Sequence, residues 1–171
     1  IPRVETPVLI LQAEKEKIVD NKNLEKLTAL FPHAESMLVL QAKHEILFER
    51  RAKEPRKNFL AFPGGFCEPD EEPEKSVMRE CSEEIGVVPE KIKFVGAFPN
   101  TYVYKKIIYK TCDMFYSASL PSGFEFKTQK SEVISLEWVK VESLADIEKI
   151  PLAFESAKKA LLKYLEIKNA R

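Results

Sequence analysis

Residues 63–87 constrain the fold of this chain more than any other segment, because a glycine turn precedes a helix with two different faces. Glycine readily adopts backbone angles that are closed to other residues, so Pro63-Gly64-Gly65 predicts a sharp turn. Pro73 suits the first turn of a helix and Gly86 suits a left-handed cap at its end, so we expect a helix between them. At about 100° per residue, this helix places four apolar side chains on one arc and three carboxylates on another: Val77, Met78, Cys81 and Ile85; Glu80, Glu83 and Glu84.

The three glutamates repel one another, which raises the free energy of keeping all of them ionised. A glutamate-rich helix is more often a solvated surface than a site. Arg79 lies four residues before Glu83 and offsets part of the repulsion. A divalent cation offsets more of it, because carboxylate oxygens suit Mg²⁺ or Mn²⁺. The helix alone therefore leaves open a solvated face and a metal site.

The surrounding spacing favours the metal site. The order is Gly65, five residues, Glu71, seven residues, and then Arg79-Glu80-Cys81-Ser82-Glu83-Glu84-Ile85-Gly86-Val87. This segment resembles the Nudix box, GX5EX7REUXEEXGU, in which U is apolar. Cys81 stands where an aliphatic residue is more usual, but its small side chain tolerates burial. The resemblance continues before the box, in residues 50–55 and 60–66, and after it, in residues 98–102, and covers residues 34–171.

The resemblance implies an α/β fold, the α/β/α sandwich of the Nudix family with a mixed sheet. It also implies hydrolysis of a nucleoside diphosphate linked to another group, with Mg²⁺ or Mn²⁺ as the cofactor and a small nucleotide as the substrate. Some relatives carry a four-cysteine zinc ribbon, but no cysteine precedes Cys67, so zinc is not expected. The segment after the box favours ADP-ribose, NADH or a similar substrate, and many relatives form homodimers, which leaves the oligomeric state open.

The same resemblance assigns roles within the box. It implies metal ligation by the Gly64 carbonyl, Glu80 and Glu84. It leaves open whether Glu83 acts as a further metal ligand or helps to deprotonate water, and it implies that Arg79 orients the carboxylates and that Glu71 pairs with Arg79 as a structural brace.

Other candidate site residues lie outside the box. Glu132, just before a strand, is a candidate general base, although an ordinary glutamate at a strand edge is at least as good an interpretation. Arg51, Lys53 and Arg56 are candidate diphosphate contacts, while a basic loop is usually just solvated. Phe98, Tyr102 and Tyr104 are candidates for stacking on a base, while aromatic residues in strands more often belong to a core.

Residues 5–49 carry a second resemblance. The segments 6–14, 18–21 and 43–49 are similar to the end of a lysophospholipase of the α/β-hydrolase fold, where Asp20 and His44 would belong to a Ser-His-Asp triad. No GxSxG elbow occurs in the chain, so the serine nucleophile is missing. We therefore divide the chain into an N-terminal α/β-hydrolase-like segment, 1–33, and a Nudix domain, 34–171.

The apolar patterns predict the remaining elements. We expect strands at 7–13, 36–41, 45–50, 91–98, 106–120 and 132–141, and helices at 23–31 and 151–167. The hairpin at 36–50 serves as the first hairpin of the Nudix sheet.

Composition excludes several classes of protein. Lys plus Arg and Asp plus Glu each total 27 in 171 residues, and this balance argues against a protein that binds duplex nucleic acid. No apolar run approaches the roughly 20 residues that cross a bilayer, and the first residues lack a signal-peptide pattern. Three cysteines without a CxxC pair indicate a reduced, cytoplasmic protein. The two resemblances leave three alternative functions. They are a Nudix hydrolase, a non-catalytic Nudix module that senses a nucleotide, and a lipid esterase remnant.

Overall fold

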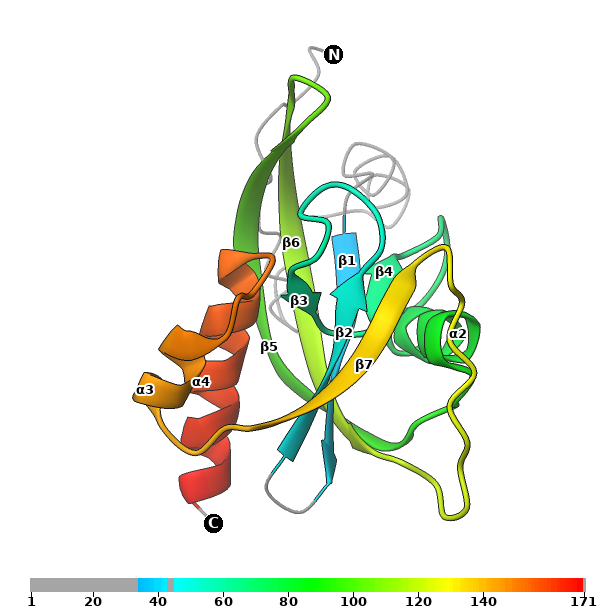
Figure 1. Ribbon diagram of the computed structural model, residues 1–171, viewed down its shortest axis with the longest axis vertical. Coiled ribbons are helices and arrows are strands. Elements are labelled where there is room, and N and C mark those ends of the chain that lie inside the picture. Colours follow the sequence, from blue (N-terminus) through cyan, green and yellow to red (C-terminus); the bar gives the residue numbers. More distant parts are fainter. Residues whose placement is uncertain (1–33, 43–44, 171) are drawn as a thin grey trace, which may run out of the picture.

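The computed structural model describes residues 34–42 and 45–170, and the predicted strand 7–13 and helix 23–31 lie outside them. A seven-stranded sheet forms the centre of the described part, with helices on its two sides (Figure 1). The elements in chain order are β1 (Ala34–Ala42), β2 (Glu45–Arg51), β3 (Leu60–Ala61), β4 (Gly64–Phe66), α2 (Pro73–Ile85), β5 (Glu90–Tyr104), β6 (Ile107–Ser119), β7 (Val133–Lys140), α3 (Leu144–Lys149) and α4 (Glu155–Asn169).

The sheet is mixed, as predicted. Its order is β3-β2-β1-β6-β5, with β4 paired to β1 and β7 paired to β2. β1 runs parallel to β6 and antiparallel to β2 and β4. The β5–β6 hairpin extends beyond the rest of the sheet (Figure 1). None of the helices in the described part of the chain is long and apolar enough to cross a membrane.

Helix α2 begins and ends where its sequence predicts. Pro73 occupies its first position, and Gly86 caps it in the left-handed region at φ 72°, donating its N–H to the Cys81 carbonyl. Val77, Cys81 and Ile85 are fully buried against one face of the sheet. Met78, expected on the same arc, is only partly buried. The apolar face of α2 is therefore narrower than its sequence indicates.

Helix α4 covers the opposite face of the sheet. Leu161 packs there with Phe48, Phe62 and Phe115. A buried polar group lies in this layer: the carboxylate of Asp113 on β6 accepts hydrogen bonds of 2.5 Å from the hydroxyls of Thr111 and Ser156, the latter in the first turn of α4. These bonds tie α4 to the sheet, because a buried carboxylate needs donors.

Three segments differ from their predicted structure. The strand expected at 91–98 extends to Tyr104 in β5, because the residues after Phe98 continue to pair with β6. The glycines expected in a sharp turn form β4, in which Gly65 is paired with Ser36, although Gly64 retains a φ of 143° that favours glycine. The helix expected from residue 151 begins only at Glu155. The reason is tertiary pairing: Leu60 donates its N–H to the Pro151 carbonyl and accepts one from Ala153, which keeps 151–153 extended. The short helix α3 was not predicted, and a capping box between Ser143 and Asp146 begins it.

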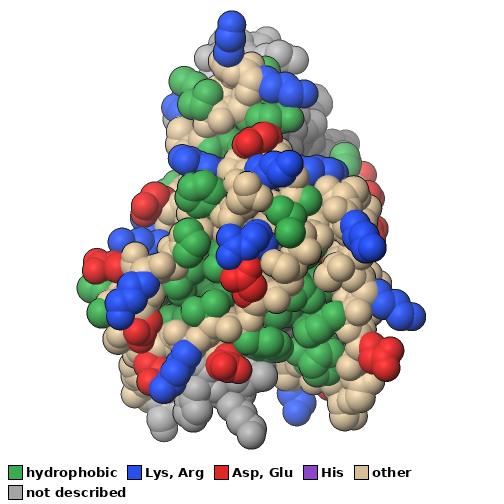
Figure 2. All heavy atoms as spheres, viewed as in Figure 1, with side chains coloured by type: hydrophobic (Ala, Val, Ile, Leu, Met, Phe, Trp, Pro, Cys, Tyr) green, Lys and Arg blue, Asp and Glu red, His purple; other side chains and the backbone are tan. Residues whose placement is uncertain are grey.

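The surface of the described part mixes both signs of charge. Lys and Arg side chains alternate with Asp and Glu over the face shown in Figure 2. This agrees with the balanced composition and provides no continuous basic surface on that face.

Candidate active site

A cavity of about 480 Å³ lies where β4, helix α2 and the tyrosines of the β5–β6 hairpin meet. Carboxylates form one part of its wall and aromatic rings another. Its lining comprises Arg51, Glu54, Pro55, Gly64, Gly65, Phe66, Glu80, Glu83, Glu84, Tyr102, Tyr104, Tyr109, Gln129, Glu132 and Phe154.

The three glutamates of α2 are in different environments, although they share one arc of the helix. Glu84 is only 8% exposed, and the Gly64 N–H donates to its Oε2 at 2.8 Å. Glu80 lies against Gly65, where a Cβ atom would come within 2.7 Å of its carboxylate carbon. Glu83 is mostly exposed. The two glycines therefore allow the backbone of β4 to approach the glutamates closely.

Arg79 holds this group together. Its Nε and Nη2 donate to the two carboxylate oxygens of Glu71, each at 2.9 Å. Its Nη1 donates to Glu80 at 2.7 Å and to Glu83 at 3.5 Å, and Nη2 also reaches the Phe66 carbonyl. The hydrogen bonds from Arg79 lower the pKa of Glu71 to about 2. Arg79 thus links the loop before α2 to the carboxylates of the cavity.

Negative charge in the cavity is incompletely compensated. The pKa of Glu84 is raised to about 7, mainly by burial and in part by the charges of Glu80 and Glu132, while the Gly64 N–H and the charge of Arg51 oppose the shift. Burial also raises the pKa of Glu80, although the hydrogen bond and charge of Arg79 oppose this. Oxygen donors with excess negative charge fit Mg²⁺ or Mn²⁺. In the described part of the chain, however, no three His, Cys, Asp or Glu side chains are already arranged to hold a metal ion.

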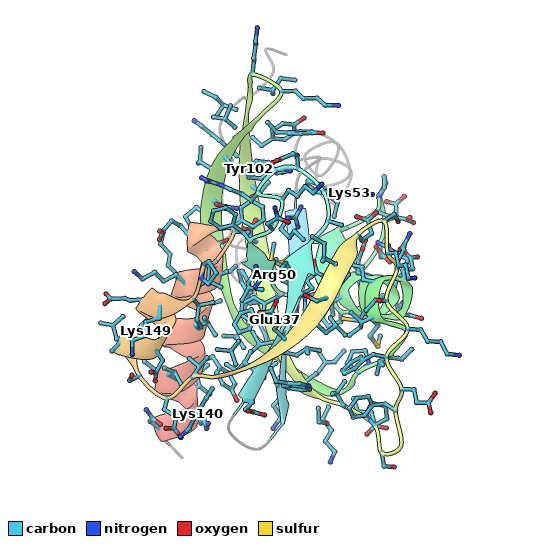
Figure 3. The ribbon with its side chains drawn as sticks, viewed as in Figure 1. Arg50, Lys53, Tyr102, Glu137, Lys140 and Lys149 are labelled. Carbon is cyan, nitrogen blue, oxygen red and sulfur yellow. The ribbon has the colours of Figure 1, made fainter. Side chains whose placement is uncertain are left out.

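Glu132, the candidate general base, lines the cavity just before β7. Its carboxylate forms an ion pair with Lys53, and its backbone carbonyl accepts from the Ala52 N–H. Lys53, a predicted substrate contact that is labelled in Figure 3, does not line the cavity. Its ammonium group instead forms the ion pair with Glu132. In the same loop, the Gln129 N–H donates a hydrogen bond to the Glu84 carbonyl, which connects this loop to the end of α2. Lys130, the next residue, is exposed.

Aromatic rings form the wall that carries no carboxylate. Tyr102 stacks on Tyr109, with ring centroids 5.2 Å apart and planes 6° from parallel. The Tyr102 ring also packs against Phe154, and these ring centroids are 5.2 Å apart as well. The Arg51 guanidinium lies 5.4 Å from the centroid of the Phe154 ring. Tyr104 also lines the cavity.

Two other predicted contacts lie elsewhere. The Phe98 ring packs against Phe115 of the core, with the ring centroids 6.0 Å apart, and does not line the cavity. Arg56 lies over Phe59 and lines a neighbouring cavity of about 300 Å³ instead. Six lining residues were not expected from the sequence, namely Glu54, Pro55, Phe66, Tyr109, Gln129 and Phe154, and no motif marks the last three.

The NUDIX domain family matches residues 31–163. The chain belongs to this family. An ADP-ribose pyrophosphatase of Methanocaldococcus jannaschii is 32% identical over 84 residues, 48% of this chain and 50% of that protein. The 8-oxo-dGTP diphosphatase of Escherichia coli is 36% identical over 71 residues, 39% of this chain and 55% of that protein. The chain thus spans about half the length of these NUDIX relatives.

A solved NUDIX structure shares the fold over nearly the whole length of this chain. The NUDIX domain of Shewanella oneidensis NrtR, in complex with ADP ribose, superposes with a TM-score of 0.60 at 24% identity and covers 95% of this chain and 99% of that one. At this identity the likeness shows the fold.

The second resemblance is also present. The alpha/beta hydrolase fold family matches residues 1–51, and a probable lysophospholipase L2 of Haemophilus influenzae is 74% identical over 50 residues, 29% of this chain but 16% of that protein. Of the matched segment, the structure describes 34–42 and 45–51, which form β1 and β2 of the NUDIX sheet. Asp20 and His44 lie outside the described residues.

Proposed function

We propose that this NUDIX domain hydrolyses the diphosphate bond of a nucleoside diphosphate linked to another group, in a reaction that requires Mg²⁺. One observation carries the proposal: a single cavity joins the glutamates of the box to a stacked aromatic wall. Carboxylates serve the diphosphate through a cation, and aromatic faces bind bases by stacking. A substrate with both a diphosphate and a base matches both parts of the cavity.

In this mechanism Glu80, Glu83 and Glu84 hold the cation, together with the Gly64 carbonyl. Arg79 orients Glu80 and Glu83 through its hydrogen bonds and is itself held by Glu71. Mg²⁺, when bound, neutralises charge on the phosphate oxygens and lowers the pKa of the attacking water.

The protein's own groups complete the reaction. Glu83 or Glu132 accepts the proton of the water, and Glu132 does so after its ion pair with Lys53 opens. This pair opens at little cost, because exposed ion pairs are weak and the Lys53 side chain is 52% exposed. Arg51, which lies beside the aromatic wall, compensates the charge of the diphosphate.

For the substrate, we favour ADP-ribose, NADH or a similar compound. The M. jannaschii relative is named an ADP-ribose pyrophosphatase, and the S. oneidensis domain was solved with ADP ribose. Stacked aromatic rings in the cavity suit the adenine base of such a compound.

The test is product release from a panel of nucleotides with and without Mg²⁺, followed by chromatography. We expect metal-dependent cleavage of ADP-ribose, and a loss of at least about 100-fold in kcat for Glu83→Gln and for Glu84→Gln, since each removes a charged group from the reacting centre. The matched control is Glu90→Gln, an exposed glutamate at the start of β5. Full activity in both box variants would show that the site is assigned to the wrong residues.

The second candidate is a module that binds a nucleotide without cleaving it. The ion pair between Lys53 and Glu132 favours it, because Glu132 is a weaker base for as long as this pair stays closed. Calorimetry on ADP-ribose distinguishes the two functions: binding without product, with Mg²⁺ and Mn²⁺ both tried, supports the sensing module.

A further inference from the structure

Glu49 is a buried carboxylate at a position of β2 that packing alone would give to an apolar residue. It is 2% exposed and lies in register with Leu136 of β7 and Ala61 of β3. Side chains two residues apart in a strand share a face, and Leu47, two residues earlier, packs against Cys81 of α2. Glu49 therefore faces α2, on the same side of the sheet as the glutamates of the box.

One oxygen of the Glu49 carboxyl group lacks the donor that such burial requires, although a side-chain hydrogen bond joins this group to Glu84. Oε2 of Glu49 has no hydrogen-bond partner among the residues that the structure describes. A buried acceptor without a donor is uncommon in native proteins and calls for an explanation, such as a bound ion. Glu49 was not among the site residues expected from the sequence, because it lies outside the box and within an apolar strand.

The charged groups around Glu49 are those of the active-site cavity. They are Glu84, in side-chain contact with it, followed by Arg51 and Glu132. Glu49 itself does not line the cavity, but it contacts Glu84, which does. Arg51 compensates this charge only in part, because its Nε donates to the Pro55 carbonyl and its guanidinium lies over Phe154. The carboxyl groups of Glu49 and Glu84 are thus in contact, and the Arg51 guanidinium offsets only part of their negative charge.

We propose that Glu49 is a further carboxylate of the metal centre and holds, together with Glu84, a divalent cation on the sheet side of α2. The proposal rests on the metal dependence of the proposed function, and it adds a ligand from the strand β2 to those of the box. A cation at this point supplies the positive charge that Oε2 of Glu49 lacks.

The test is Mn²⁺ binding to the full chain, measured by calorimetry and by electron paramagnetic resonance, without any nucleotide. Three variants are compared with the wild type. Glu49→Gln removes the charge and keeps the shape, Glu49→Asp keeps the charge on a shorter side chain, and Glu45→Gln is the matched control, an exposed glutamate of the same strand. A thermal melt of each variant with EDTA verifies that it folds.

We expect Glu49→Gln to lose one bound Mn²⁺, or to bind it at least about 10-fold more weakly, and to gain less in melting temperature from Mn²⁺ than the wild type. Glu49→Asp should be intermediate, and Glu45→Gln should match the wild type. Unchanged Mn²⁺ binding in a folded Glu49→Gln overturns the inference and leaves a buried carboxyl pair that only packs. Binding of no Mn²⁺ by the wild type also overturns it.

The outcome is separate from that of the proposed function. A wild type that binds Mn²⁺ through Glu49 but releases no product from any nucleotide contradicts the hydrolase and supports this ligand. Metal-dependent hydrolysis by the wild type, with the same Mn²⁺ binding in wild type and Glu49→Gln, supports the hydrolase and contradicts the role of Glu49 as a ligand.

Discussion

Arg79 is the residue on which the geometry of the site most depends, because it bonds to three carboxylates at once. Its two parallel hydrogen bonds to Glu71 are of the charge-assisted, bidentate kind that restricts orientation as well as adding energy. Glu71 lies in the loop before α2, so this pair connects the loop to the helix. It also sets the direction from which Arg79 reaches Glu80.

Replacement of Glu71 should therefore destabilise the protein in a pH-dependent way. We expect Glu71→Gln to lower the free energy of unfolding by about 1 kcal/mol at neutral pH, after allowance for screening by solvent. The folded-state pKa of Glu71 is about 2, below the ordinary 4.5, so its stabilisation is fully present above 4.5 and disappears as the pH falls through 2. Urea unfolding of wild type and variant from neutral to acid pH measures this difference.

The control for this experiment is Glu72→Gln. Glu72 forms an exposed ion pair with Lys75, with both side chains about two-thirds exposed, and its removal should change stability by less than about 0.5 kcal/mol. A difference between wild type and Glu71→Gln that stays constant down to the lowest pH would contradict the role given to the charge of Glu71.

At the scale of elements, local sequence signals predicted α2 and most strands. Pro73 and Gly86 act within one turn of the helix, so they could be read without knowledge of the fold. The start of α4 could not be predicted in this way. Its apolar pattern extends back to Leu152, but the backbone of Leu60, more than ninety positions earlier, holds 151–153 in an extended conformation. Non-local hydrogen bonds of this kind leave no mark on the local sequence.

One buried carboxylate contributes to the attachment of α4 to the sheet, in addition to the apolar packing of this helix. Ser156→Ala removes a donor from Asp113, which is fully buried, and we expect it to lower the free energy of unfolding by about 2 kcal/mol. Ser119→Ala is the control, since the Ser119 hydroxyl makes a long, exposed bond of 3.3 Å to the Glu90 carbonyl. Chemical denaturation compares the two, and equal stabilities would show that Ser156 does not hold the helix.

At the scale of the whole molecule, the cavity combines parts that the sequence treats unequally. The box motif predicted the carboxylates of α2 from the sequence, because all of them lie within one short segment. Of the aromatic wall, Tyr102 and Tyr104 were among the candidates from the sequence, whereas Tyr109 and Phe154 were not, since they lie on β6 and just before α4 and only the fold brings them to the cavity. Phe98 shows the converse: its strand position suggested a base contact, and its ring packs with the core instead.

The aromatic wall makes a kinetic prediction that is distinct from the chemistry of the box. Phe154→Ala removes a ring that contacts both Tyr102 and the guanidinium of Arg51, and stacking on a base contributes about 1–3 kcal/mol, so we expect KM for ADP-ribose to rise about 10-fold with little change in kcat. Phe124→Ala is the control, because Phe124 is an exposed aromatic that does not line the cavity. Steady-state kinetics at saturating Mg²⁺ measures both parameters. A fall in kcat at unchanged KM would place Phe154 with the reacting groups and remove the base from the aromatic wall.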